Sequence, residues 1–225
     1  MFDLPTLFFL TAVTTTFLGT VLLALWLQDR KLAMLAIWGS AQLLGGVGIG
    51  LVSARGLIPD SISIVTANGL VLVACGLAWN GARSFERRRL LWLPGLAAAA
   101  IWLSACQVPL FYGSLNSRVI LLYGAIATYF GLAAREFWRG RQEYLPSRWM
   151  VLTVLGSHAL LYGSRVPLTL LWPQDPAAGL PALRGWFVLL TAETLIHSTA
   201  MAVLLVALTK ERAEVMAVRH LVTAR

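Results

Sequence analysis

The chain has 225 residues, of which 58% are hydrophobic and only 12% are charged, and its mean hydropathy is +0.75. Soluble domains are about half apolar and about a quarter charged, so this composition excludes an ordinary soluble domain and predicts a membrane protein. The formal net charge is +8, but the arginines stand in short clusters between apolar runs, which favours a topology signal over nucleic-acid binding.

Apolar runs long enough to cross a bilayer occur about seven times, which predicts an all-α integral membrane protein with seven transmembrane helices. The first run is too long for a signal peptide and lacks a basic start, so we expect it to be retained as a helix. Turn-forming stretches such as RGLIPD and WPQDPAAGLP separate the runs. The expected spans are Leu4–Leu27, Leu32–Val52, Ile62–Ala82, Leu90–Leu110, Val119–Ala134, Trp149–Leu171 and Gly185–Leu208.

Basic clusters follow the first, third, fifth and seventh expected spans, at residues 29–31, 82–89, 134–148 and 209–212. The opposite loops carry little basic charge, mainly Arg55, Arg118 and Arg184. The positive-inside rule then predicts an N-terminus outside and a C-terminus in the cytoplasm. We interpret the RRR run at 87–89 as part of this topology signal, with a lipid-headgroup site as the alternative.

Glycines and cysteines within the apolar runs have structural interpretations. The segment LLGGVGIGLV resembles a phosphate-binding loop, but it lies inside a span, where Gly46 and Gly50 form a small-xxx-small pair suited to close helix packing. Cys75 and Cys106 lie in apolar runs without CxxC spacing. We expect them to be buried thiols rather than a disulfide or a metal site.

Other polar residues in the chain narrow the function classes. A retinal Schiff base needs a lysine in the middle of the last span, and the only lysines, Lys31 and Lys210, are at span ends. Retinal binding is therefore excluded. Gln42, Asn68 and Gln107 are uncharged, and we expect them to form hydrogen bonds across helices.

Ionisable residues inside a membrane mark functional sites, and the last two expected spans contain a group of them. His158, Tyr162 and Arg165 follow each other at i, i+4 and i+7, so they share one helix face. Glu193 and His197 are four residues apart and share a face of the last span. Counting the helical rise from the span ends predicts that His158 is level with His197, and Arg165 with Glu193.

We expect Arg165 to neutralise Glu193, either at a functional site or as a structural clamp. The two histidines can bracket a haem b iron as axial ligands, with Arg165 near a propionate. Hydrogen-bonded or proton-relay histidines are the alternatives. No Asp or Cys is close enough in sequence to complete a zinc site. The candidate binding residues are thus His158, Tyr162, Arg165, Glu193 and His197, with the two histidines as candidate metal ligands.

Residues 209–225 are charged and contain no proline or glycine, so the last transmembrane helix is expected to continue into the cytoplasm as a signalling helix. We divide the chain accordingly into a transmembrane domain, 1–208, and this helix. Leu208, Val215 and Val222 are seven residues apart, with Val218 at a d position and Glu211 interrupting another. This pattern suggests a parallel dimeric coiled coil, and a frayed helix end is the alternative.

A multi-helix membrane region that ends in LTKERAE resembles the N-terminal sensor half of bacterial GGDEF-type diguanylate cyclases. In that family a cytoplasmic helix leads into a DPLTGLxNRR stretch and the cyclase domain, neither of which is present by Arg225. The resemblance implies the bacterial inner membrane, a homodimer and c-di-GMP signalling. The cyclase chemistry itself would lie outside these residues, so this segment is not expected to be an enzyme.

The sequence therefore predicts a membrane sensor that detects a small ligand, a redox state or a gas at the polar site, and relays it through the last helix. A continuous helix from an intramembrane site to the cytoplasm can carry a shift or rotation outward. The alternative is a small transporter or proton-conducting protein that uses the same polar residues. A haem-bearing electron carrier is a third possibility, but it needs a second redox partner.

Overall fold

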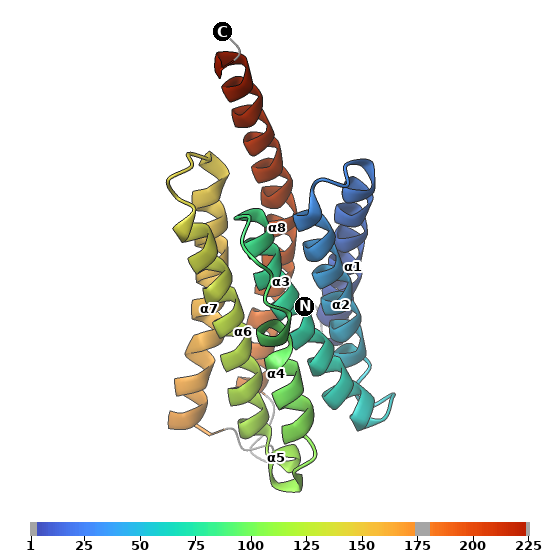
Figure 1. The fold of residues 1–225 in the computed structure, drawn as a ribbon. Helices are drawn as coiled ribbons and strands as arrows, with labels where there is room; N and C mark the ends of the chain where they lie inside the picture. Colours follow the sequence, from blue (N-terminus) through green and yellow to red (C-terminus); the bar gives the residue numbers. More distant parts are fainter. Residues whose placement is uncertain (1–3, 174–180, 224–225) are drawn as a thin grey trace.

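The computed structural model describes residues 4–173 and 181–223, and this part of the chain is an all-helical bundle (Figure 1). Its only β-type pairing is an isolated bridge between Arg55 and Ile58. The elements are α1 Leu4–Gln28, α2 Ala33–Ser53, the π-helical turns η1 Ser61–Thr66, α3 Ala67–Phe85, α4 Trp92–Ala105, α5 Pro109–Gly113, α6 Leu115–Arg139, α7 Pro146–Leu171 and α8 Pro181–Thr223.

Five helical segments in the described chain are long and apolar enough to cross a membrane, which fits a multi-pass membrane protein. They are Leu4–Gln28, Ala33–Ser53, Ser61–Phe85, Leu115–Arg139 and Gly185–Ala217. The expected limits of these spans agree with the helices to within a few residues at most ends. α7 has 26 residues but is not among the five, because the polar residues on it lower its mean hydropathy.

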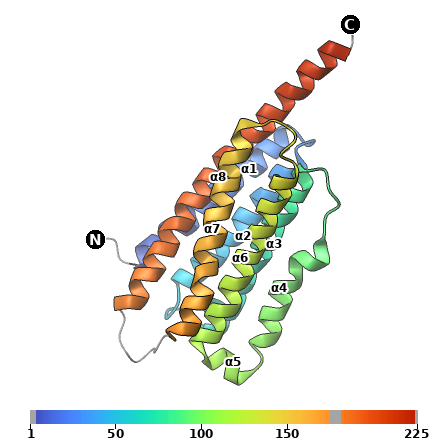
Figure 2. The same ribbon diagram turned by 90° about the vertical axis from the view of Figure 1, so that its left-hand side faces the viewer.

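The fourth expected span, Leu90–Leu110, is not one continuous helix. α4 has only 14 residues, and at about 1.5 Å per residue it is shorter than a bilayer core of about 30 Å. A break precedes Pro109, which begins α5, since a residue before proline is pushed out of the helical region. A non-helical segment also separates α4 from α3 (Figure 2).

α3 lies in the centre of the bundle and contacts α2, α4 and α6. Small residues allow the backbones to approach closely. A Cβ on Gly46 of α2 would meet the Thr16 hydroxyl and would lie 3.0 Å from the Ala12 carbonyl oxygen, whereas one on Gly50 would lie 3.7 Å from the Ala12 methyl. The packing role expected for Gly46 is therefore confirmed, and Gly50 is less tightly constrained. Cys75 and Cys106 are free and buried, as predicted.

Polar side chains link α8 to the first two helices. The Gln42 amide donates to the Ser198 carbonyl oxygen at 3.2 Å, and the Thr15 hydroxyl donates to the Ser198 hydroxyl at 3.4 Å. The cross-helix role expected for Gln42 is confirmed. The prediction is wrong for Asn68 and Gln107, whose side-chain amides, within the described residues, donate to carbonyl oxygens four residues earlier in their own segments.

α8 has 43 residues and continues well beyond the rest of the bundle, as its red C-terminal part shows in Figures 1 and 2. The continuation of this helix past Leu208 was predicted and is confirmed. Leu208 itself is fully buried within the bundle, and Val215 packs against the same core. The first positions of the suggested heptad pattern therefore pack within this chain rather than facing outward. The side chains of Val218 and Val222 lie outside the described residues.

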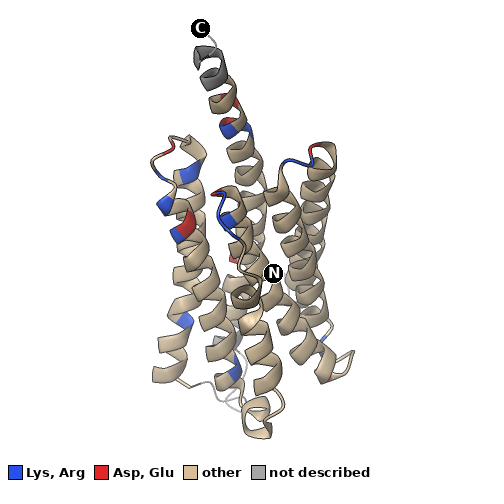
Figure 3. Cartoon of the chain, in the orientation of Figure 1, with Lys and Arg blue, Asp and Glu red and all other residues tan. Residues whose placement is uncertain are grey.

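Charged residues gather at the end of the bundle from which α8 projects (Figure 3). Arg83 of α3 pairs with Glu136 of α6 at 2.6 Å, and Arg88 reaches the same carboxylate at 3.3 Å. Further ion pairs join Arg148 to Glu86 and Glu143, and Arg212 to Glu143. We call this end of the bundle, with its network of ion pairs, the charged end. Its members are Arg83, Glu86, Arg88, Glu136, Glu143, Arg148 and Arg212.

Candidate functional site

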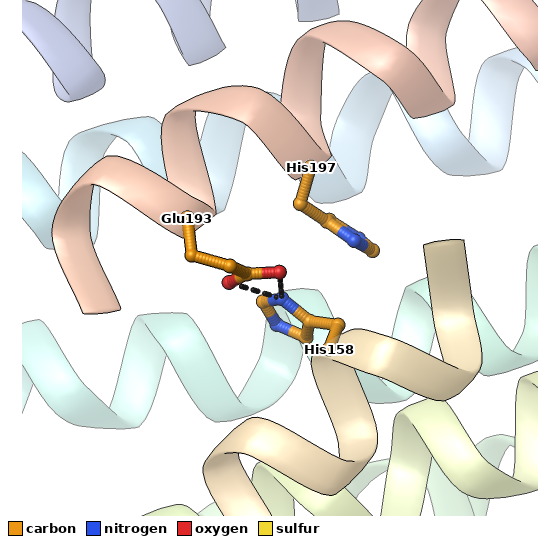
Figure 4. A group of neighbouring side chains, drawn as sticks. All are labelled: His158, Glu193 and His197. Carbon is orange, nitrogen blue, oxygen red and sulfur yellow. Dashed lines mark hydrogen bonds and ion pairs between the residues drawn. The ribbon is translucent and has the colours of Figure 1, made fainter. Parts of the chain in front are cut away.

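His158 of α7 and Glu193 of α8 face each other inside the bundle (Figure 4). The His158 Nδ1 atom lies 2.9 and 2.8 Å from the two carboxylate oxygens of Glu193. Only 3% of His158 is exposed. The Glu193 side chain is 22% exposed, and a carboxylate this far out of water needs a hydrogen-bond donor or a counter-charge, which His158 supplies from the neighbouring helix.

His197 lies one turn after Glu193 on α8, and its ring stacks on the ring of His158. The ring centroids are 4.0 Å apart and the planes are 29° apart. Phe130 of α6 packs edge-on against both rings, at 4.4 Å from His158 and 5.0 Å from His197. The prediction that the two histidines are level is thus confirmed. We call His158, Glu193 and His197 the inner cluster.

Tyr162 extends the inner cluster along α7. Its ring lies 4.5 Å from the His158 ring, and it meets Tyr123 of α6 edge-on at 5.3 Å. Its hydroxyl is 2.6 Å from the Thr194 hydroxyl of α8. Tyr162 therefore orients the His158 ring and fixes the register of α7 against α8.

The prediction of an ion pair between Arg165 and Glu193 is wrong. Arg165 is 2% exposed, and its guanidinium lies over the ring of Trp186, 5.2 Å from the centroid. Arg165 is seven residues after His158, and on an antiparallel helix its neighbour should be about seven residues before Glu193, which is where Trp186 stands. Counting depth from approximate span ends misjudged the register by about one to two turns.

The geometry does not fit a haem between the histidines. Axial ligation places the porphyrin plane between two imidazoles that each point a nitrogen at the iron. Here the rings are stacked face to face at 4.0 Å, which leaves no space for a macrocycle between them.

A single metal ion fits the residues better. His158, Glu193 and His197 each offer a ligand atom, and these atoms lie within 4.8 Å of one another. The sequence analysis considered only Asp and Cys as further metal ligands, and the third ligand here is a glutamate. Arg165 was expected to neutralise Glu193, but in the structure Glu193 joins the two histidines.

A cavity of about 230 Å³ adjoins the inner cluster, with His158, Tyr162 and His197 in its wall. The wall is mostly apolar, and it also contains Arg55 and Arg118. Arg55 follows α2 and Arg118 stands in the first turn of α6, so both lie at the end of the bundle opposite the charged end. Burial lowers the pKa of Arg55, and the nearby Arg118 lowers it further. The cavity wall thus extends from the cluster to two arginines at that end of the bundle.

Several contacting residues were missed by sequence reasoning. Phe130, Thr194 and Trp186 carry no ionisable group, so only the helix register reveals them. Glu136 is buried at the charged end and the side chain of Glu86 is only 8% exposed, although their sequence clusters indicate solvated loops. The sequence did contain one signal for these pairs. Glu86 and Glu136 stand among several arginines, and an acidic residue in such a cluster can pair with an arginine.

Comparisons of this chain with protein-family models, with curated proteins and with solved structures give no match. Function must therefore be inferred from the inner cluster, the cavity and the path of α8.

Proposed function

We propose that this chain is a membrane signal-transduction domain in which the state of the inner cluster sets the position of α8. Its signal is a small species that reaches the cluster through the adjoining cavity. The observation that carries the proposal is the continuity of α8. Glu193 and His197 stand on the same unbroken helix as the segment that projects beyond the bundle (Figure 1). A shift or rotation of a rigid helix at one end is carried to the other.

Contacts where α8 leaves the bundle support this coupling. The Glu211 carboxylate accepts from the backbone N–H of Ser147, at 3.2 and 3.3 Å, and from its hydroxyl at 2.6 Å. Ser147 lies in the first turn of α7, where an acidic group is favoured by the helix dipole. Arg212 bonds to Glu143 and to the Phe85 carbonyl oxygen. α7 and α8 are thus joined both at the inner cluster and at the exit.

The output domain that α8 would regulate is also part of the proposal, and it rests on the sequence resemblance. The resemblance of Thr209–Glu214 to the segment before a GGDEF domain favours a diguanylate cyclase that is regulated by α8. Two cyclase domains must meet to condense two GTP molecules, so the proposal includes a homodimer. The positive-inside rule favours a cytoplasmic location for the charged end. The resemblance favours a bacterial inner membrane.

Hydrogen–deuterium exchange of the purified protein tests the coupling. We replace Glu193 by Gln, which keeps the side-chain shape but removes the charge. We expect the backbone amides of residues 209–217 to exchange at least about threefold faster, because a neutral amide binds His158 more weakly than the carboxylate does and so holds α8 less firmly. Unchanged exchange in this segment would contradict the relay.

The matched control is Thr199→Val. Thr199 is an exposed residue of α8 that bonds only within its own helix in the described contacts, to the Leu195 carbonyl oxygen at 2.9 Å. Because it lies outside the cluster, we expect exchange of residues 209–217 to match the parent. A control that behaves like Glu193→Gln would show general loosening of α8.

The cavity favours one rival function, transport of a small solute or protons past His158 and His197. Reconstituted vesicles separate the two functions. Steady flux that requires the histidines supports transport, whereas a relay needs no net movement of solute.

A further inference from the structure

We propose that the inner cluster is a binding site for one divalent transition-metal ion, with zinc or copper as the preferred class and His158, Glu193 and His197 as ligands. This inference rests on the proposed function, since it names the species that the sensor detects. It has its own experiment, because the cluster can bind a metal whether or not α8 relays the event.

The donor atoms are of the right type and spacing. Two imidazoles and one carboxylate are a common ligand set for zinc, at about 2.0–2.2 Å from the ion. Ligand atoms around such an ion are about 3–3.5 Å apart. The three donors already lie within 4.8 Å of one another, so they need to move only slightly to meet at one ion.

An orphaned nitrogen supports the same conclusion. His197 is 6% exposed, and its Nδ1 atom is buried without a hydrogen-bond partner among the described residues. A buried polar atom without a partner costs about 1–3 kcal/mol and calls for an explanation such as an ion. Its position beside the His158–Glu193 pair makes a shared ion the simplest one (Figure 4).

The donor set selects among cations. Imidazole nitrogens favour zinc, copper, nickel and cobalt, whereas magnesium and calcium prefer oxygen-only ligands. Three protein ligands leave at least one position of a tetrahedral ion open, which is typical of reactive rather than structural sites. The cavity supplies room for water or a small anion at that position.

Two arginines in the cavity wall predict slow entry of a cation. Arg55 and Arg118 line the cavity at the end away from the charged end, and they repel an approaching dication. Salt screens this repulsion, since the Debye length falls from about 30 Å at 0.01 M to about 10 Å at 0.1 M. We therefore expect the association rate to rise with ionic strength.

The experiment titrates Co²⁺ into untagged, metal-free protein in detergent and records the visible d–d absorption bands. The parent should bind one Co²⁺ per chain with the intense bands of a four- or five-coordinate ion, and Zn²⁺ should displace it. His158→Ala, Glu193→Gln and His197→Ala should each weaken binding by more than about 100-fold, since even outer-shell changes cost 10–100-fold.

Ser157→Ala is the control. Ser157 is exposed on α7 beside His158 and donates to the Val154 carbonyl oxygen, so it should bind Co²⁺ like the parent. Circular dichroism checks that each variant is folded, and the parent result stands even if one variant is not. Failure of the parent to bind Co²⁺ or Zn²⁺ overturns the metal site, as does binding that survives all three substitutions. A Soret band lost in both histidine variants would overturn it in favour of haem. None of these outcomes decides the relay, which is tested without metal.

Discussion

The inner cluster and the charged end both bury ionisable groups where α7 meets its neighbours, but they satisfy them differently. At the charged end, Arg148 is 1% exposed and contacts two carboxylates and the Phe137 carbonyl oxygen, although its Nε atom has no hydrogen-bond partner among the described residues. The inner cluster has one carboxylate and two histidines, and one histidine nitrogen has no partner among the described residues. It also adjoins a cavity.

This difference indicates a structural role for the charged end and a binding role for the inner cluster. A network in which each charge has an opposite charge has little to gain from a ligand, and it serves to hold helices in register. A cluster with an unpartnered histidine nitrogen and an adjoining cavity is stabilised when a ligand binds to that nitrogen. Burial raises the pKa of the Glu86 carboxyl, and the Arg148 guanidinium opposes this shift. The pairing at the charged end therefore depends on both partners.

The largest expected effect is at the charged end. Arg148→Met leaves Glu86 buried without its cation, which should lower the free energy of unfolding by about 3–5 kcal/mol. Thermal unfolding in detergent measures this, and the double variant with Glu86→Gln should recover part of the loss. Arg141→Met, at an exposed arginine in the loop that precedes α7, is the control. Equal stability of Arg148→Met and the parent would show that this network does not hold the bundle.

The pH dependence of Arg148→Met sharpens this test. Without Arg148, only the weaker attraction of the Arg212 guanidinium opposes the upward shift that burial imposes on the pKa of Glu86. A carboxyl whose pKa is raised in the folded state favours folding less as pH rises through that pKa. The loss of stability in Arg148→Met should therefore be larger at pH 8 than at pH 5. Equal losses at both pH values would mean that Glu86 is not the group left unpaired.

An intermediate effect is expected where α8 leaves the bundle. Arg212 is partly exposed, bonds to Glu143 and the Phe85 carbonyl oxygen, and lies over the Phe85 ring at 3.6 Å. Arg212→Met keeps much of the apolar contact but loses the polar bonds, so we expect a loss of about 1–2 kcal/mol. Chemical denaturation measures it. A loss as large as that of Arg148→Met would place the main clamp on α8 instead.

The smallest effect is expected at the inner cluster. Glu193→Gln keeps the shape of the side chain and can still bond to His158, so stability should change by less than about 1 kcal/mol. Cobalt binding should nevertheless be lost. This combination distinguishes a binding site from a structural clamp. A loss of several kcal/mol in Glu193→Gln would assign the cluster to architecture.

Sequence reasoning predicted the helices better than their mutual register. Periodicity and hydropathy gave the limits of α1 and α2, and the breaker-free tail gave the extension of α8. The i, i+4 spacing also gave the faces that carry His158 and His197. The ion pair assigned to Arg165 and Glu193 failed because register depends on interhelical packing, which a count from approximate span ends does not contain. The break before Pro109 was missed because hydropathy runs through it.

The charged end could be predicted only in part. Its basic clusters were interpreted as topology signals, and Figure 3 shows charged residues gathered at one end as that interpretation requires. The buried pairs of Glu86 and Glu136 were not expected, since each acid and its arginine partner are about 50 to 60 residues apart. Pairing over such separations is set by the fold, and a single sequence carries no record of it.

The central claim is that the inner cluster sets the position of α8, and a distance across the exit tests it most directly. Spin labels at Arg141→Cys and Ala217→Cys, both exposed sites, are placed in a background with Cys75 and Cys106 replaced by Ala. Pulsed electron–electron double resonance then measures the distance distribution between the two labels in the parent, in Glu193→Gln and in Thr199→Val. We expect Glu193→Gln to shift the mean distance by about 1–2 Å, the usual size of helix shifts in signalling transitions, or to broaden the distance distribution clearly. Thr199→Val should match the parent. Three superimposable distance distributions would contradict the claim.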